Sequence, residues 1–256
     1  MSWRRIVTAI LLLASSLLAQ EIPAGTVLPV MLRTTLDGRT GRPGQPIRGK
    51  LMQDVLLPAG KRLSAGAEVT GRVIRVSAPN PQTGSQLVLE FNRLVSHRQA
   101  FSMITNLRAI ASMMAVFEAQ LPTSTFDDYG TSTSDWTTFQ VGGDAVYRGA
   151  GAVVSPTAEV VGSASHAGAV TAKLTPVRAS GCRGALDDND REQALWIFST
   201  SACGAYGFPD LKIAHADRTE PLGQITLESS RNVYIKSGSG WLLRVQASSP
   251  ASISHP

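Results

Sequence analysis

The sequence has few of the residues from which metal and thiol sites are built. It contains two cysteines and four histidines in 256 residues, and the histidines stand singly at His97, His166, His215 and His255. A zinc site needs three or four Cys and His ligands at short spacing, so the sequence predicts no zinc site, and we expect no cofactor. The formal net charge is only +5, with 17% charged residues. This weak, scattered charge predicts no nucleic-acid partner.

Sequence motifs for common catalytic chemistries are also missing. There is no Gly-x-Ser-x-Gly elbow, no Gly-x-Gly-x-x-Gly loop and no Walker sequence, which leaves the usual hydrolase and nucleotide-binding classes without support. Cys203 with His215 or His166 is a conceivable nucleophile and base. Nothing around them is typical of a cysteine hydrolase, and Cys182 is available as a disulfide partner. The sequence therefore predicts no catalytic residues.

Long apolar runs are absent after residue 20. The nearest candidate, residues 104–117, is interrupted by Asn106 and Arg108 and is shorter than the ~20 apolar residues that a membrane span needs. This stretch is typical of a buried strand or helix instead.

The first twenty residues have the pattern of a secretory signal peptide. Arg4 and Arg5 precede a mostly apolar run at residues 6–18, and small or polar residues follow. An uncleaved membrane anchor and a buried N-terminal helix are the alternatives. We expect cleavage after Ala19 or Gln20, no stable membrane span afterwards, and a periplasmic or secreted protein.

The two cysteines form an even pair in a chain with this signal. Cys182 and Cys203 are separated by twenty residues, and oxidising compartments allow such pairs to persist as disulfides. We therefore predict a Cys182–Cys203 bridge.

An acidic cluster lies between the cysteines, at Asp187, Asp188, Asn189 and Asp190. An exposed acidic turn is the simpler interpretation. A weak calcium site is the alternative, because Ca²⁺ prefers carboxylate and amide oxygens, although the spacing does not follow the EF-hand pattern.

Glycine, proline and short apolar runs dominate the rest and favour strands. The chain has 23 Gly and 14 Pro, and its apolar runs have strand length and are separated by turn residues. The predicted strands are residues 26–32, 46–55, 67–77, 86–95, 100–109, 194–198, 210–214, 223–227, 233–236 and 241–245. Residues 110–120 predict a short helix or an extension of the preceding strand.

The predicted fold class is therefore mainly β, a modified β-barrel or sandwich built from N- and C-terminal strands. We divide the chain into a signal peptide (1–20), an N-terminal β part (21–119), a Gly/Ser/Thr/Ala-rich connection (120–181), a C-terminal β part (182–247) and a disordered tail (248–256). The connection is expected to be partly mobile, with one or two short ordered pieces.

The aromatic side chains of the C-terminal part allow two interpretations. Trp196, Tyr206, Phe208 and Trp241 are candidates for a groove that binds a glycan or a peptide. The alternative is that they pack in the core of a β layer.

Several segments resemble one known family. Residues 22–37 (IPAGTVLPVMLRTTLD) resemble the start of the C-terminal domain in the VirB10/TrbI proteins of bacterial type IV secretion and conjugation systems. Residues 46–55 (PIRGKLMQDV), 57–60 (LPAG) and 69–71 (VTG) are similar to the next strand, turn and strand of that family. Residues 232–245 (NVYIKSGSGWLLRV) are similar to its closing strands.

This resemblance implies an extracytoplasmic β-barrel module in which N- and C-terminal strands share one sheet system, with a role in envelope assembly. The family keeps a membrane anchor, a Pro-rich stretch and a helical hairpin that crosses the outer membrane. Here the first motif follows the apolar segment at once, and no segment matches the hairpin. We therefore expect an exported protein that shares the module rather than a pore subunit.

The sequence thus favours a non-enzymatic envelope module that binds a protein partner or a cell-wall component. The alternative is a small secreted hydrolase with a site in the C-terminal part. A cleft in which His215 or Asp210 meets a Ser or Cys at hydrogen-bond distance would favour the hydrolase.

Overall fold

The computed structural model describes residues 21–123, 136–149, 151–166, 168–177, 191–216 and 221–247. The predicted signal peptide, Cys182, the acidic residues Asp187–Asp190 and the tail lie outside these residues. Among the residues that are described, no helix has the length and apolarity to cross a bilayer.

One large, mainly antiparallel sheet contains both the first and the last strand of the described chain. Within the described residues its strands are β1 (Val27–Leu32), β3 (Pro46–Leu51), β6 (Glu68–Asn80), β7 (Gly84–Ser96), β8 (Gln99–Ser102), β9 (Thr105–Ala111), β16 (Gly204–Tyr206), β17 (Leu211–Ile213), β18 (Ile225–Ser229) and β20 (Gly240–Val245). Their order is β16-β9-β20-β1-β3-β6-β7-β18-β17, with β8 on β7. In the described ladders the end strands β16 and β17 do not pair with each other, so the sheet is open and the fold fits the sandwich form of the prediction.

The first and last strands of the described chain are neighbours, as predicted. β1 pairs antiparallel with β20, from Val27 opposite Arg244 to Met31 opposite Gly240. β1 also pairs with β3 on its other side. Neither β1 nor β20 is left as an open sheet edge, which would be free to pair with another chain.

A second sheet occupies most of the segment that was predicted to be a connection. Its strands follow chain order and are β10 (Thr137–Phe139), β11 (Ala145–Tyr147), β12 (Ala152–Val154), β13 (Val160–Ala164), β14 (Val170–Ala172) and β15 (Gln193–Ala194). Five of these lie in residues 120–181, where one or two ordered pieces were expected. Strands of three residues with a single buried valine, such as Val146 or Val153, give too weak a pattern to detect among Ser, Thr and Gly.

The remaining elements are short. β2 (Leu36–Asp37) pairs with β19 (Tyr234–Ile235), and β4 (Val55–Leu56) pairs with β5 (Arg62–Leu63) around the 3-10 turn η1 (Pro58–Gly60). The strand predicted at residues 100–109 is divided between β8 and β9. After β9 comes the helix α1 (Met113–Glu118), which Ser112 caps by accepting a hydrogen bond from the Ala115 amide at 3.2 Å.

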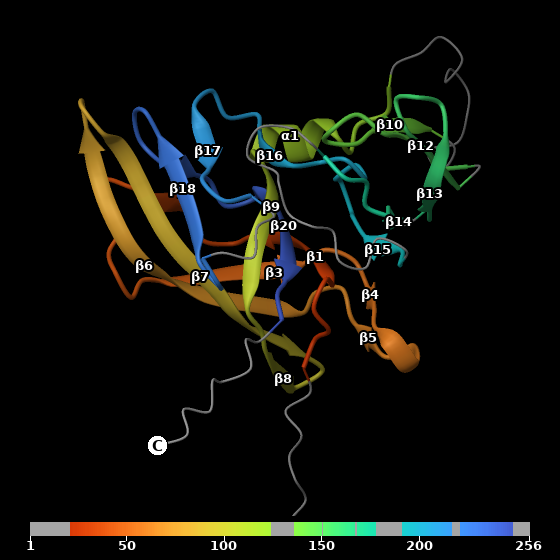
Figure 1. The fold of residues 1–256 in the computed structure, drawn as a ribbon. Coiled ribbons are helices and arrows are strands. Elements are labelled where there is room, and N and C mark those ends of the chain that lie inside the picture. Colours follow the sequence, from red (N-terminus) through yellow and green to blue (C-terminus); the bar gives the residue numbers. More distant parts are fainter. Residues whose placement is uncertain are drawn as a thin grey trace, which may run out of the picture.

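Two apolar cores lie on opposite faces of the strands β1, β9 and β20. Leu28, Trp241 and Leu243 point into the core of the large sheet. Their sequence neighbours Val27 and Leu242 point the other way, into a core shared with the second sheet. Successive side chains of a strand alternate between faces, so burial on both sides explains why these strands are continuous apolar runs. Figure 1 shows the second sheet (green to cyan) beside the large one.

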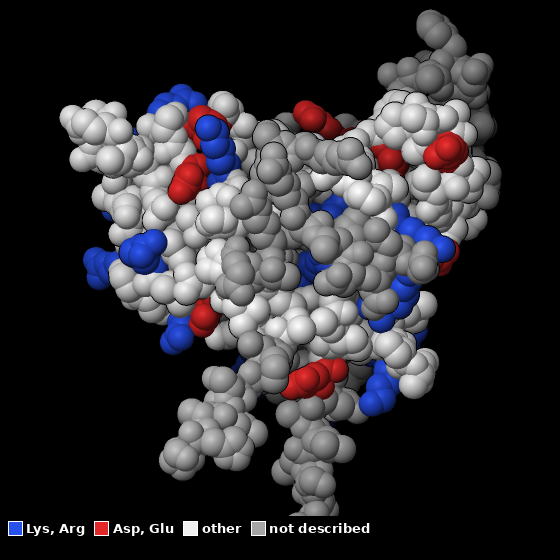
Figure 2. All heavy atoms as spheres, in the orientation of Figure 1, with Lys and Arg blue, Asp and Glu red and all other residues white. Residues whose placement is uncertain are grey.

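The charged residues lie mostly on the outside. On the face that Figure 2 shows, Lys and Arg are scattered and interspersed with Asp and Glu among uncharged side chains. This distribution agrees with the weak net charge of the sequence.

Candidate functional site

An open groove lies over the solvent face of β3. It has a volume of about 770 Å³ and is lined by Arg33, Thr34, Gln45, Pro46, Arg48, Gly49, Lys50, Gly66 and Glu68. The burial of β3 alternates, so that Ile47 and Leu51 enter the core while Arg48 and Lys50 face solvent. The period of two in the strand therefore places both cations on the same face.

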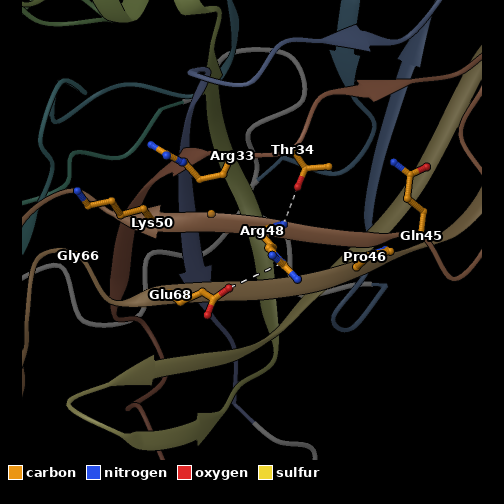
Figure 3. Close-up of a pocket in the computed structure, with 9 residues that line it drawn as sticks. Arg33, Thr34, Gln45, Pro46, Arg48, Lys50, Gly66 and Glu68 are labelled. Atoms are coloured by element: carbon orange, nitrogen blue, oxygen red, sulfur yellow. Dashed lines mark hydrogen bonds and ion pairs between the residues drawn. The ribbon is translucent and has the colours of Figure 1, made fainter.

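The backbone beside the groove is held in place by the segment that follows β1. The Arg33 amide donates a hydrogen bond to the Arg48 carbonyl at 2.8 Å, and the Arg48 amide donates to Thr34 Oγ1 at 3.0 Å. Figure 3 shows Arg48 between Thr34, in the segment after β1, and Glu68 of β6. Gly49 is needed between the two cations, because a Cβ there would overlap the side chain of Val30. The groove wall is thus built from elements that pack on the core.

The groove is cationic. Its lining holds three cations, Arg33, Arg48 and Lys50, and one carboxylate, that of Glu68, whose Oε1 lies 4.0 Å from Arg48 Nε. Their side chains are 70% (Arg48) and 54% (Glu68) exposed, and ion pairs this exposed contribute at most about 1 kcal/mol. All three cations can therefore reach a ligand at little cost. The sequence alone does not reveal this cluster, because Arg33 lies in a different segment from Arg48 and Lys50 and only the fold brings the three together.

A second polar cluster surrounds Asp210. Its Oδ2 accepts hydrogen bonds from Ser229 Oγ at 2.8 Å and Ser230 Oγ at 2.9 Å, and from the Arg231 amide at 3.2 Å. Asp210 also lines two open pockets, of about 600 and 350 Å³. A contact between Asp210 and a serine is the observation expected for the hydrolase alternative.

The chemistry of that cluster is that of a structural clamp. The hydrogen bond from Ser229, followed by that from Ser230, holds the pKa of Asp210 below its usual value. A general base works best with a pKa near the operating pH, so lowering the pKa makes Asp210 a poorer base for activating a serine. His215 is exposed, and the hydrogen bonds described for Asp210 come from Ser and Arg residues only.

One Ser–His pair was missed by the sequence analysis. Ser64 Oγ lies 2.6 Å from His97 Nε2, a separation suited to a nucleophile and its base. The pair is exposed, and His97 lies in the turn between β7 and β8, where its φ is 48°. Within the described residues no carboxylate is hydrogen-bonded to the His97 ring. Because 33 positions separate Ser64 from His97, no sequence motif could have revealed the pair.

The four aromatic candidates do not form one groove. Trp241 is fully buried and packs edge-on against Phe91, with ring centroids 5.5 Å apart. Trp196 is also buried. Tyr206 is half-buried, and its hydroxyl accepts a hydrogen bond from the Cys203 amide at 2.9 Å. Phe208 is half-buried against the core of the large sheet. For Trp241 the core interpretation is the correct one, because it lies on the inner face of β20.

The cysteine and acidic predictions remain predictions. Cys182 and the cluster Asp187–Asp190 lie outside the described residues. In the part of the chain that is described, no three His, Cys, Asp or Glu residues gather in a way that could hold a metal ion.

No protein-family model and no curated protein matches the chain.

Proposed function

We propose that this protein is an exported, non-enzymatic β module of the bacterial cell envelope that binds a protein partner or a cell-wall component. The cationic groove over β3 is the binding surface, and the observation that carries the proposal is its set of three exposed cations against a single carboxylate. The partner therefore presents acidic groups at this surface. The proposed location, periplasmic or secreted, depends on the signal-like residues 1–20.

The groove has the properties of a surface for a large partner. It is open, and two of its cations, Arg48 and Lys50, stand on β3, a strand paired on both sides, with β1 and with β6, while Arg33 directly follows β1. Long Lys and Arg side chains on a rigid base adapt to an extended acidic surface, and their attraction raises the rate of encounter. The segments that resemble VirB10/TrbI proteins include β1, β3 and β20, which lie side by side. A role related to secretion or conjugation is part of this proposal.

The hydrolase alternative has less support. Among the described residues, the serines that donate hydrogen bonds to Asp210 stabilise its carboxylate and lower its pKa. The Ser64–His97 pair is exposed, and no carboxylate among the described residues orients it. Both arrangements are better explained as local clamps of turns.

The test compares two triple variants of equal charge change. Arg33→Ala/Arg48→Ala/Lys50→Ala removes the groove cations, and a control removes three exposed cations elsewhere, at Lys61, Arg93 and Lys212. Cells of the native host are fractionated, and each tagged protein is used to capture partners and purified cell-wall sacculi at low and at raised salt.

We expect the groove variant to lose about tenfold in affinity for a partner that the wild type captures, because exposed ion pairs contribute up to ~1 kcal/mol each. Binding of the wild type should also weaken with salt, since exposed charges are screened. Equal losses in the two variants would contradict the groove as the binding surface. Recovery of the protein from the cytoplasm alone would contradict export.

A further inference from the structure

A separate cavity of about 520 Å³ lies between the chain that follows β3 and the turns of the second sheet. One wall is formed by Met52, Gln53 and Asp54, and the opposite wall by Arg148, Ser165, Gly168, Ala169, Trp196 and Ile197, with Ala65 and Gln120 also lining it. This cavity shares no lining residue with the groove over β3.

Gln53 fixes the walls of the cavity to each other. Its Oε1 accepts hydrogen bonds from the Trp196 amide at 2.6 Å and the Val170 amide at 3.1 Å. Its Nε2 donates to the Val170 carbonyl at 2.9 Å. The side chain is buried and bridges segments more than one hundred positions apart. The cavity is therefore preformed, which lowers the cost of ordering a site when a ligand binds.

Arg148 brings an incompletely satisfied charge to this wall. The residue is only 6% exposed. Its Nη2 donates a hydrogen bond to Thr138 Oγ1 at 3.2 Å, whereas its Nη1 is buried and has no hydrogen-bond partner among the residues that the structure describes. No carboxylate forms an ion pair with Arg148 among the described residues. A buried cation without a counter-charge is costly, so an acceptor for Nη1 would relieve that cost.

The character of the lining narrows the kind of acceptor. Met52, Trp196, Ile197 and Ala169 supply apolar contact surface, and Arg148 is the only cation in the lining. The lining also includes the exposed carboxylate of Asp54, which is paired with Arg62 at 3.1 Å. One guanidinium matches one carboxylate in charge and in planar geometry. Arg148 alone would neutralise only part of the charge of a doubly charged phosphate, and the negative carboxylate of Asp54 would repel it.

We propose that this cavity binds an organic monocarboxylate, with the carboxylate on Arg148 and the apolar group against Trp196 and Ile197. Because Nη1 is covered by protein, its contact with the carboxylate requires the guanidinium to turn toward the cavity, while the backbone walls that Gln53 joins stay in place. The ligand is either a free carboxylic acid or the C-terminal residue of a peptide. The volume suits either source, since small-molecule sites commonly measure ~300–1,000 Å³.

The test uses the whole chain and calorimetric titration with matched probes. Hexanoate, its neutral analogue hexanamide, and inorganic phosphate separate the charge and shape requirements. A tripeptide ending in leucine, with a free or an amidated C-terminus, separates the two sources of carboxylate. We expect hexanoate to bind at least about tenfold more tightly than hexanamide, because hydrogen bonds to a charged group contribute ~1.5–3 kcal/mol.

Three variants locate the binding. Arg148→Gln should weaken hexanoate binding by about 10- to 100-fold. Ala169→Phe, which keeps the arginine but fills the cavity, should abolish it. Arg93→Gln removes an exposed arginine on β7 and should leave it unchanged.

Several results would overturn the proposal. These are equal binding of hexanoate and hexanamide by the wild type, no binding of hexanoate at millimolar concentration, tighter binding of phosphate, or full binding by a folded Arg148→Gln protein. The comparison of hexanoate with hexanamide needs no variant, so it holds even if a substitution prevents folding. Because the groove and the cavity share no residue, this test can fail without affecting the groove proposal.

Discussion

Trp241 gives the sharpest test of how the two ends of the chain are joined. It lies in β20, opposite Val30 of β1 and Ile110 of β9. Its side chain is completely buried and meets the ring of Phe91 on β7 edge-on, at 5.5 Å between centroids. We predict that Trp241→Ala destabilises the whole fold rather than a binding surface.

The magnitude follows from the buried area. A buried tryptophan removes ~150–250 Å² from water, which at ~25 cal/mol per Å² corresponds to roughly 4–6 kcal/mol. The edge-to-face contact with Phe91 adds ~0.5–1.5 kcal/mol. Trp241 Nε1 is buried and has no partner in the described part of the chain, and this opposes the gain by ~1–3 kcal/mol. We therefore expect Trp241→Ala to lower the free energy of unfolding by about 3–5 kcal/mol.

Trp241→Phe separates packing from hydrogen bonding. It keeps a ring against Phe91 and removes the unpartnered indole nitrogen, so the loss should be only about 1–2 kcal/mol. Urea unfolding followed by far-ultraviolet circular dichroism measures both variants. Tyr234→Ala, at an aromatic residue that is 48% exposed, serves as the control and should change stability by less than about 1 kcal/mol. A loss below about 1 kcal/mol for Trp241→Ala would refute the assignment of this side chain to the core.

Three further predictions concern single contacts. Gly71→Ala should cost about 2 kcal/mol in the same urea titration, because a Cβ there would overlap the backbone carbonyl of Glu90; unchanged stability would disprove the close approach of β6 and β7. Asp210 has a lowered pKa in the folded chain, so its contribution is complete above the unfolded pKa and is lost as the pH falls through the folded pKa. Asp210→Asn should therefore flatten the acid side of the stability profile, and an unaltered profile would count against the clamp. Thiol titration of the denatured, unreduced protein should find no free thiol if Cys182 and Cys203 are bridged, whereas two reactive thiols would show that they are not.

The large sheet was predictable because its strands are strongly patterned. The run at residues 241–245 became β20, and the run at residues 67–77 became most of β6. Turn glycines were equally informative. Gly25 and Gly60, which follow the two Pro-Ala pairs, adopt positive φ values of 81° and 70°, a conformation that glycine accepts without strain.

The second sheet was less predictable because its strands are short and its residues small. In β12 only Val153 is fully buried, and β13 has no fully buried residue. Such strands are stabilised by neighbours that cover them, here the outer faces of β1 and β20 through Val27 and Leu242. Their pattern depends on tertiary packing more than on local propensity.

The candidate sites were invisible to sequence reasoning for a different reason, which is distance along the chain. The wall of the cavity that Arg148 lines depends on hydrogen bonds between Gln53 and residues 117 and 143 positions away. A glutamine, an arginine and a turn glycine have no significance until the fold brings them together, and each is common on an ordinary polar surface. Burial changes their meaning: an exposed Arg148 would be solvated and unremarkable, whereas a buried Arg148 with an unpartnered Nη1 requires an acceptor. In a chain of this kind, candidate sites are therefore best found by searching the structure for buried polar groups that lack partners. A sequence motif becomes useful only after such a group has been found.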